Sequence, residues 1–137
     1  MKVVRHRNVL VLALLTISAV SALSAAVLTQ GGQAPPITAV SIIQLISKPE
    51  AYDGKRVSIT GFVRFEFEGN SIYLHEEDYR NGLYKNGMWL SMEERKELNN
   101  RYALIEGSFN AGNKGHLGLW SGSIENVSRA IPWPPTR

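Results

Sequence analysis

Five residues of the sequence carry imidazole or carboxylate groups that could bind a metal ion. Histidine and carboxylate side chains are common ligands of zinc and other divalent cations. Four of the five are consecutive, and a second histidine could complete a site if the fold brings it close. The alternative is a solvated charged loop, because the side chains of adjacent residues diverge and no two histidines are spaced four residues apart. The candidate metal ligands are His75, Glu76, Glu77, Asp78 and His116.

A second group of candidate residues is aromatic. We expect Phe62, Tyr73 and Trp89 on the outer face of a β-barrel, where OB-fold proteins use aromatic rings to stack bases or sugars. Trp120 belongs to a glycine-rich segment over 115–122, where a ligand could approach the backbone and stack on the ring. In the alternative interpretation the glycines form bulges and Trp120 packs in the core. These four aromatic residues are the candidate ligand-binding residues.

Several other kinds of catalytic site lack the residues that they need. The sequence has no cysteine, which excludes thiolate nucleophiles, thiolate zinc sites and thiol redox chemistry. No serine lies in a Gly-x-Ser-x-Gly motif, and there is no glycine-rich phosphate loop. A divalent metal is therefore the one cofactor that the sequence suggests, and nothing in the sequence requires it.

The distribution of charge argues against nucleic acid as a partner. The chain has 15 basic and 12 acidic residues and a formal net charge of +3. Lys2, Arg5 and Arg7 supply this whole excess, so the chain from residue 29 onward is formally neutral. Nucleic-acid binding requires a positive surface, because phosphate contacts dominate the affinity.

Residues 1–28 have the pattern of an export signal. Basic residues precede an uncharged apolar stretch over 9–28, whose second half consists mainly of Ser and Ala. This order is typical of a cleavable signal peptide, although the stretch is also long enough to span a bilayer. In both cases the positive-inside rule places the following domain outside the cytoplasm. We expect a periplasmic or secreted protein, or one that residues 9–28 anchor in the inner membrane.

The pattern over 38–131 predicts a single, mostly β domain after a flexible linker over 29–37. The spacing of Ala39, Ile42, Ile43 and Ile46 indicates a short amphipathic helix. Strict alternation of apolar and polar residues then predicts a long first strand, with the side chains from Val57 to Phe67 facing inward at every second position. Further strands are expected over 71–75, 88–90, 101–109 and 116–120, the last resuming over 124–129, with a helix over 92–99 and a Pro-rich tail over 132–137.

This order of elements matches a five-stranded barrel of the OB type. The long first strand and the helix between the third and fourth strands are both features of that fold. Closing the barrel would also remove open sheet edges, which a domain without disulfides would benefit from. The alternative is an antiparallel sheet packed by helices.

Several motifs resemble a group of small bacterial proteins, some with an export signal, for which no activity is established. The resemblance covers about residues 38–129 and implies a bacterial origin and an OB-like, β-rich fold, without implying an activity. The motifs that carry it are Tyr52–Val57, Gly61-Phe62, Glu66–Asn70, Tyr73–Asp78, Glu106-Gly107 and Gly115–Gly122.

We therefore expect a non-catalytic, exported module of the bacterial envelope that binds a protein or a small ligand. One alternative is a metal-dependent enzyme or metal-binding protein that uses His75, His116 and the nearby carboxylates. The other is an OB-type protein that binds nucleic acid or oligosaccharide.

Overall fold

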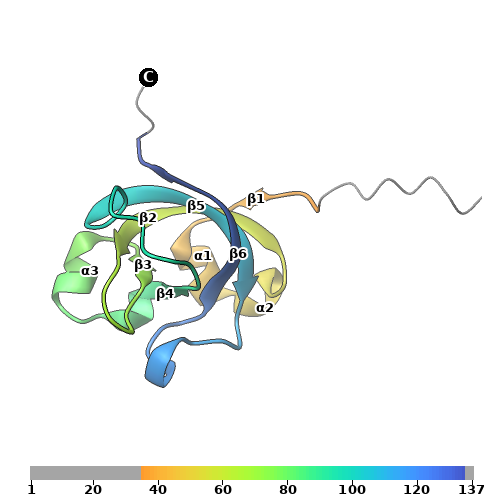
Figure 1. Cartoon of the computed structure of the whole chain (residues 1–137). Coiled ribbons are helices and arrows are strands. Elements are labelled where there is room, and N and C mark those ends of the chain that lie inside the picture. The colour runs from red at the N-terminus through yellow and green to blue at the C-terminus, as the bar shows by residue number, and fades with distance from the viewer. Residues whose placement is uncertain (1–34, 135–137) are drawn as a thin grey trace, which may run out of the picture. The chain divides into compact units, whose positions relative to one another are not determined.

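The computed structural model describes residues 35–134, and these residues form a small β-barrel with a few short helices (Figure 1). The predicted signal or anchor over 1–28 and most of the predicted linker lie outside the described residues. No helix within 35–134 is long and apolar enough to cross a bilayer. The elements are β1 (Thr38–Ala39), α1 (Ile42–Ser47), α2 (Pro49–Tyr52), β2 (Arg56–Arg64), β3 (Ser71–Tyr73), α3 (Glu76–Arg80), η1 (Tyr84–Asn86), β4 (Gly87–Leu90), β5 (Arg101–Asn110), η2 (His116–Gly118) and β6 (Ser123–Pro132).

Five of the strands close into a barrel. The order around it is β2-β3-β4-β6-β5, and β5 pairs back with β2 to complete the ring. The pair β4–β6 is parallel, whereas the other four pairs of the ring are antiparallel. The structure thus confirms a mostly β chain with a closed five-stranded barrel, a topology that is compatible with an OB-like fold.

The alternating pattern of β2 places its apolar residues inside the barrel. Val57, Ile59 and Val63 are buried, whereas the alternate residues Arg56, Ser58 and Thr60 are only partly buried. The expectation that Phe67 also faces inward is wrong, because β2 ends at Arg64 and Phe67 lies in the turn that follows, where its side chain is 92% exposed. Alternation predicts which face a residue takes only for as long as the strand continues.

The helix α1 covers part of the barrel interior. Ser41 caps its N-terminus, since the Ser41 hydroxyl accepts from the Gln44 amide at 3.2 Å and the Gln44 side chain accepts from the Ser41 amide at 2.8 Å. Ile42 and Leu45 are fully buried, whereas Ile43 points to solvent. Ala39 belongs to β1, which pairs in parallel with β2. The core contains Ile42, Leu45, Val57, Ile59, Val63, Phe65, Ile72, Met88, Leu90, Leu98, Ala103, Ile105, Phe109, Ile124 and Ala130.

Two predicted elements are absent and one unexpected helix is present. Residues 92–99 form an irregular segment that ends in turns instead of a helix, with Leu98 buried as an anchor and Arg95 donating to the carbonyl of Ala130 at 2.9 Å. A helix of this length has marginal intrinsic stability, so these tertiary contacts decide its conformation. The predicted strand over 116–120 is instead a short turn, η2, because Leu117 and Gly118 have positive φ.

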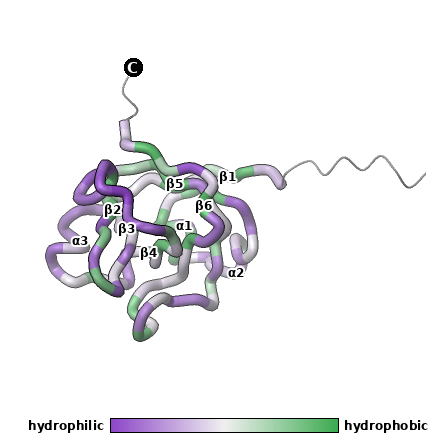
Figure 2. The backbone as a smooth tube through the Cα atoms, viewed as in Figure 1, coloured by the Kyte–Doolittle hydropathy of each residue, from purple (hydrophilic) through white to green (hydrophobic). Residues whose placement is uncertain are grey.

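The unexpected helix α3 forms in the polar segment that follows β3. The Asp78 side chain accepts from the His75 amide at 3.0 Å and fixes the first turn of the helix. Figure 2 shows α3 mainly in the hydrophilic colour, as expected for a short surface helix, although the side chain of Asp78 is buried. The polar composition of residues 75–82 predicted a polar loop outside the barrel, and the structure shows that it is also compatible with one helical turn.

Candidate functional site

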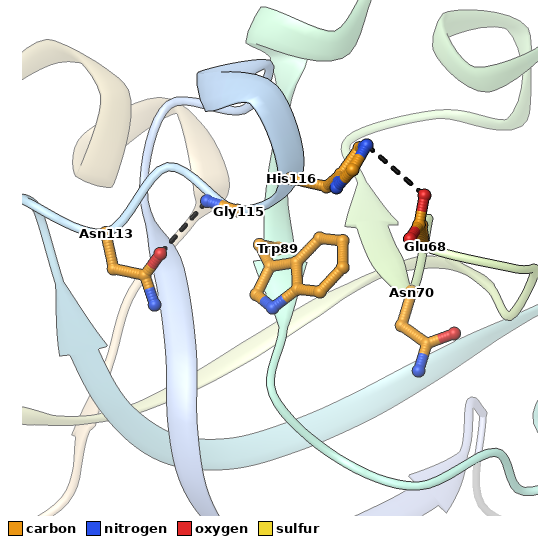
Figure 3. Close-up of a pocket in the computed structure, with 6 residues that line it drawn as sticks. All are labelled: Glu68, Asn70, Trp89, Asn113, Gly115 and His116. Carbon is orange, nitrogen blue, oxygen red and sulfur yellow. Dashed lines mark hydrogen bonds and ion pairs between the residues drawn. The ribbon is translucent and has the colours of Figure 1, made fainter.

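A candidate site lies where two loops meet the strand β4 (Figure 3). One loop joins β2 to β3 and the other joins β5 to β6. They frame a cleft of about 500 Å³, a volume within the range of small-molecule sites. Its lining residues are Glu68, Asn70, Trp89, Asn113, Gly115 and His116.

Trp89 is the aromatic residue of the cleft, and its position is fixed by the barrel. In β4 it pairs with Ser71 of β3 on one side and with Ser123 of β6 on the other. Its ring packs edge to face against Trp120, with centroids 5.1 Å apart and an interplanar angle of 63°. Trp120 is buried, and its Nε1 donates to the Tyr73 hydroxyl at 3.2 Å. The partly exposed indole of Trp89 therefore stands on a rigid aromatic support.

Gly115 packs directly against one side of this indole. A Cβ atom at Gly115 would lie 2.7 Å from Cδ2 and Cε3 of Trp89, which leaves no room for a side chain. The backbone of Gly115 also has a φ of +66°, a conformation that favours glycine. Only glycine combines this backbone conformation with so close an approach to the ring.

A single carboxylate organises the loop between β5 and β6. Oε1 of Glu125 accepts from the side chains of Ser123 at 2.7 Å, Asn113 at 2.8 Å and Asn110 at 3.1 Å. These hydrogen bonds, that from Asn113 first, lower the pKa of Glu125 from its ordinary value. Asn113 in turn accepts from the Gly115 amide at 3.0 Å, so the network reaches the glycine that touches Trp89.

A contact between a histidine and a carboxylate joins the two loops across the rim of the cleft. Nε2 of His116 lies 3.3 Å from Oε2 of Glu68, and the two side chains are 40% and 52% exposed. Glu68 has a φ of +53° and Leu117 a φ of +54°, conformations that cost energy for residues with a Cβ atom. Strained backbone thus occurs at the rim of the cleft in both loops.

The predicted metal ligands do not gather around one point. His116 pairs with Glu68, whereas Glu76 forms an ion pair with Arg80 on α3. Both oxygens of the Asp78 carboxylate accept hydrogen bonds, from the His75 amide and from the Asn86 side chain. Within residues 35–134, no group of three or more His, Asp or Glu side chains is arranged to hold a metal ion. The arrangement of the described side chains therefore gives no support to a metal site. Metal binding stays a prediction for His75, Glu76, Glu77, Asp78 and His116.

The predicted aromatic residues have different surroundings. Phe62 and Tyr73 are buried, since Tyr79 of α3 covers both rings at centroid distances of 6.2 and 5.8 Å. Burial also raises the pKa of Tyr73. Trp120 supports the cleft from behind, and Trp89 alone of the four lines it.

The sequence did not single out Asn70 or Asn113 as site residues. Asn70 follows Gly69 in a predicted turn, and Asn113 lies in a predicted loop, so both have the signature of turn residues. Their amides line the cleft because the loops meet there, which depends on long-range strand pairing.

Comparison with protein-family models found no match, and comparisons with curated proteins and with solved structures found no significant one.

Proposed function

We propose that this protein is a non-catalytic, exported binding module of the bacterial envelope, which holds a small ligand in the cleft beside Trp89. The observation that carries the proposal is the support of Trp89 by two contacts. A buried tryptophan holds its indole from one direction and a glycine backbone holds it from another, while the ring still opens into a cleft of about 500 Å³. Such rigid positioning lowers the entropy cost of binding.

We further propose that the barrel is of the OB type. The strands β2, β3 and β4 follow one another around the ring, and β6 lies between β4 and β5, as in a Greek-key barrel. The cleft is framed by the loop between the first and second barrel strands and by the loop between the fourth and fifth. OB-fold proteins bind their ligands with these two loops. This support is an analogy between folds and gives only the place of binding.

The polar groups of the cleft suit binding better than turnover. Glu68 contacts His116. The side-chain amide of Asn70 donates to the carbonyl of Met92 at 3.0 Å, and that of Asn113 donates to the carboxylate of Glu125 at 2.8 Å. Groups that are held in this way can orient a ligand through hydrogen bonds. The proposal therefore gives the cleft no catalytic residue.

Native mass spectrometry of the protein recovered from its host's envelope tests this function. Three forms are compared: wild type, Trp89→Ala, and Trp133→Ala as a matched control, since Trp133 is 44% exposed and does not line the cleft. We expect a bound ligand on wild type and on the control, and its loss from Trp89→Ala. Equal retention by all three forms, or a bare mass for wild type, would contradict a binding role for the cleft.

A further inference from the structure

We propose that the ligand of the cleft is an uncharged saccharide, one pyranose ring of which stacks on the indole of Trp89. This inference rests on the binding role proposed above and adds the chemical class of the ligand. It is carried by three features of the cleft: a supported aromatic face, neutral hydrogen-bonding groups beside it, and the absence of Lys and Arg from its lining.

The first feature is the shape of the aromatic surface. Figure 3 views the indole of Trp89 nearly face on, with Asn70 and Asn113 on its two sides and Gly115 and His116 along one edge. The indole is partly exposed and lines the cleft, so part of its surface is open to a ligand. A pyranose ring has an apolar face of C–H groups, whose area matches an indole and which gains from leaving water.

The second feature is the hydrogen-bonding capacity that remains around the ring. An asparagine side chain has two N–H donors and two acceptor lone pairs. Asn70 donates one hydrogen to the carbonyl of Met92 and accepts one bond from the Glu66 amide. Asn113 likewise donates to Glu125 and accepts from Gly115. Each fixed amide keeps a donor and an acceptor, which is what a sugar hydroxyl needs because it both donates and accepts.

The third feature is charge. No Lys or Arg is among the lining residues, whereas Glu68 is, and the carboxylate of Glu125 lies behind Asn113. A phosphate or carboxylate ligand would therefore meet the carboxylates of Glu68 and Glu125 with no Lys or Arg among the lining residues to offset them. A cationic ligand would have to compete with His116, which already contacts the Glu68 carboxylate at 3.3 Å. An uncharged ligand avoids both costs.

Two exposed apolar side chains suggest that the saccharide is a chain. Phe67 and Leu117 directly adjoin the rim residues Glu68 and His116, and their side chains are 92% and 81% exposed. Exposed apolar side chains at the rim of a cleft offer surface that a longer ligand can cover. Sugar rings on either side of the one on Trp89 would cover them.

The test is a titration of the protein, as recovered from its host, with tetrasaccharides of matched backbone. The neutral probes are cellotetraose, mannotetraose and N-acetylated chitotetraose. The charged probes are the deacetylated, cationic chitotetraose and the anionic β-1,4-linked tetraglucuronate. Saturation-transfer NMR detects contact with the sugar, and tryptophan fluorescence gives the dissociation constant for wild type, Trp89→Ala and Trp133→Ala.

We expect at least one neutral tetrasaccharide to bind, and to bind at least about tenfold more tightly than either charged probe, a difference of about 1.4 kcal/mol. Trp89→Ala should weaken that binding by about tenfold or more, while Trp133→Ala leaves it unchanged. Failure of every neutral probe, or tighter binding of a charged one, would overturn the saccharide assignment. The native mass measurement separates the two proposals, since a ligand lost with Trp89 but of non-saccharide mass would preserve the binding role alone.

Discussion

Two aromatic clusters of this barrel differ in whether another element covers them. In the first, the α3 cluster of Phe62, Tyr73, Tyr79 and Tyr102, the helix places Tyr79 over the rings of two strands and buries them. In the second, the cleft cluster of Tyr84, Trp89 and Trp120, the rings pack edge to face and leave Trp89 open to the cleft. The hydrogen bond from Trp120 to Tyr73 joins the two clusters. An aromatic residue of the barrel is therefore buried or partly open to solvent according to the element that packs over it.

The largest expected effect is the loss of stability in Phe62→Ala, for which Phe67→Ala is the exposed control. Phe62→Ala should lower the free energy of unfolding by about 3–5 kcal/mol, because it leaves a cavity under α3. Phe67→Ala should change it by less than about 0.5 kcal/mol, since that side chain is exposed. Urea unfolding measures both values. Similar losses for the two variants would contradict the difference between a covered and an uncovered ring.

Two glycines in the loop between β5 and β6 test how Trp89 is positioned in the cleft cluster. Gly115→Ala should cost about 2–4 kcal/mol, because it adds a collision with Trp89 to the strain of positive φ. Gly118→Ala should cost only about 1–2 kcal/mol, since its φ is +68° but nothing lies near the added Cβ atom. Near-ultraviolet circular dichroism should change for Gly115→Ala alone. An unchanged tryptophan signal there would show that Gly115 does not position Trp89.

The network of Glu125 predicts a smaller, pH-dependent effect at the cleft. Because hydrogen bonds lower its pKa in the folded state, the unfolded state takes up the proton first as the pH falls. The stability from Glu125 is thus complete above the ordinary value of 4.5 and is lost as the pH falls through the lowered pKa. Glu125→Gln should cost about 1 kcal/mol at neutral pH and flatten this dependence. Unfolding curves between pH 3 and 7 measure it, and an equally steep fall in the variant would rule out this role.

The smallest expected effect concerns the ion pair across the rim. Glu68→Gln should change the free energy of unfolding by less than about 0.5 kcal/mol, because both partners are substantially exposed. Thermal unfolding at low and high salt measures it. A loss above about 1 kcal/mol would mean that the pair, and not the Glu125 network, holds the loops together.

The sequence predicted the parts of the fold that follow from local pattern. The alternation of β2 correctly gave a long first strand, and the number of barrel strands was correct. Residues 92–99 have helical composition but form turns, because the burial of Leu98 and the bond from Arg95 to Ala130 are tertiary contacts. Positive φ at Leu117 and Gly118 explains why the segment after Gly115 is not a strand.

The candidate site was predictable only in part, for a related reason. Trp89 and His116 were named as candidates from residue type, and both line the cleft. Their partners Asn70 and Asn113 join them only through loop contacts that no local pattern shows. Burial of Phe62 and Tyr73 depends on α3, a helix of five residues in a segment predicted as a polar excursion.

Hydrogen–deuterium exchange tests most directly whether the cleft cluster, and not the α3 cluster, binds the ligand. It compares the two clusters in one experiment. The protein is measured with and without a soluble digest of its host's envelope polysaccharides. We predict slower exchange over 66–70, 86–90 and 112–119, which form the cleft, and no change over 76–80 in α3. Slower exchange in α3 without a change at the cleft, or no change anywhere, would contradict the account.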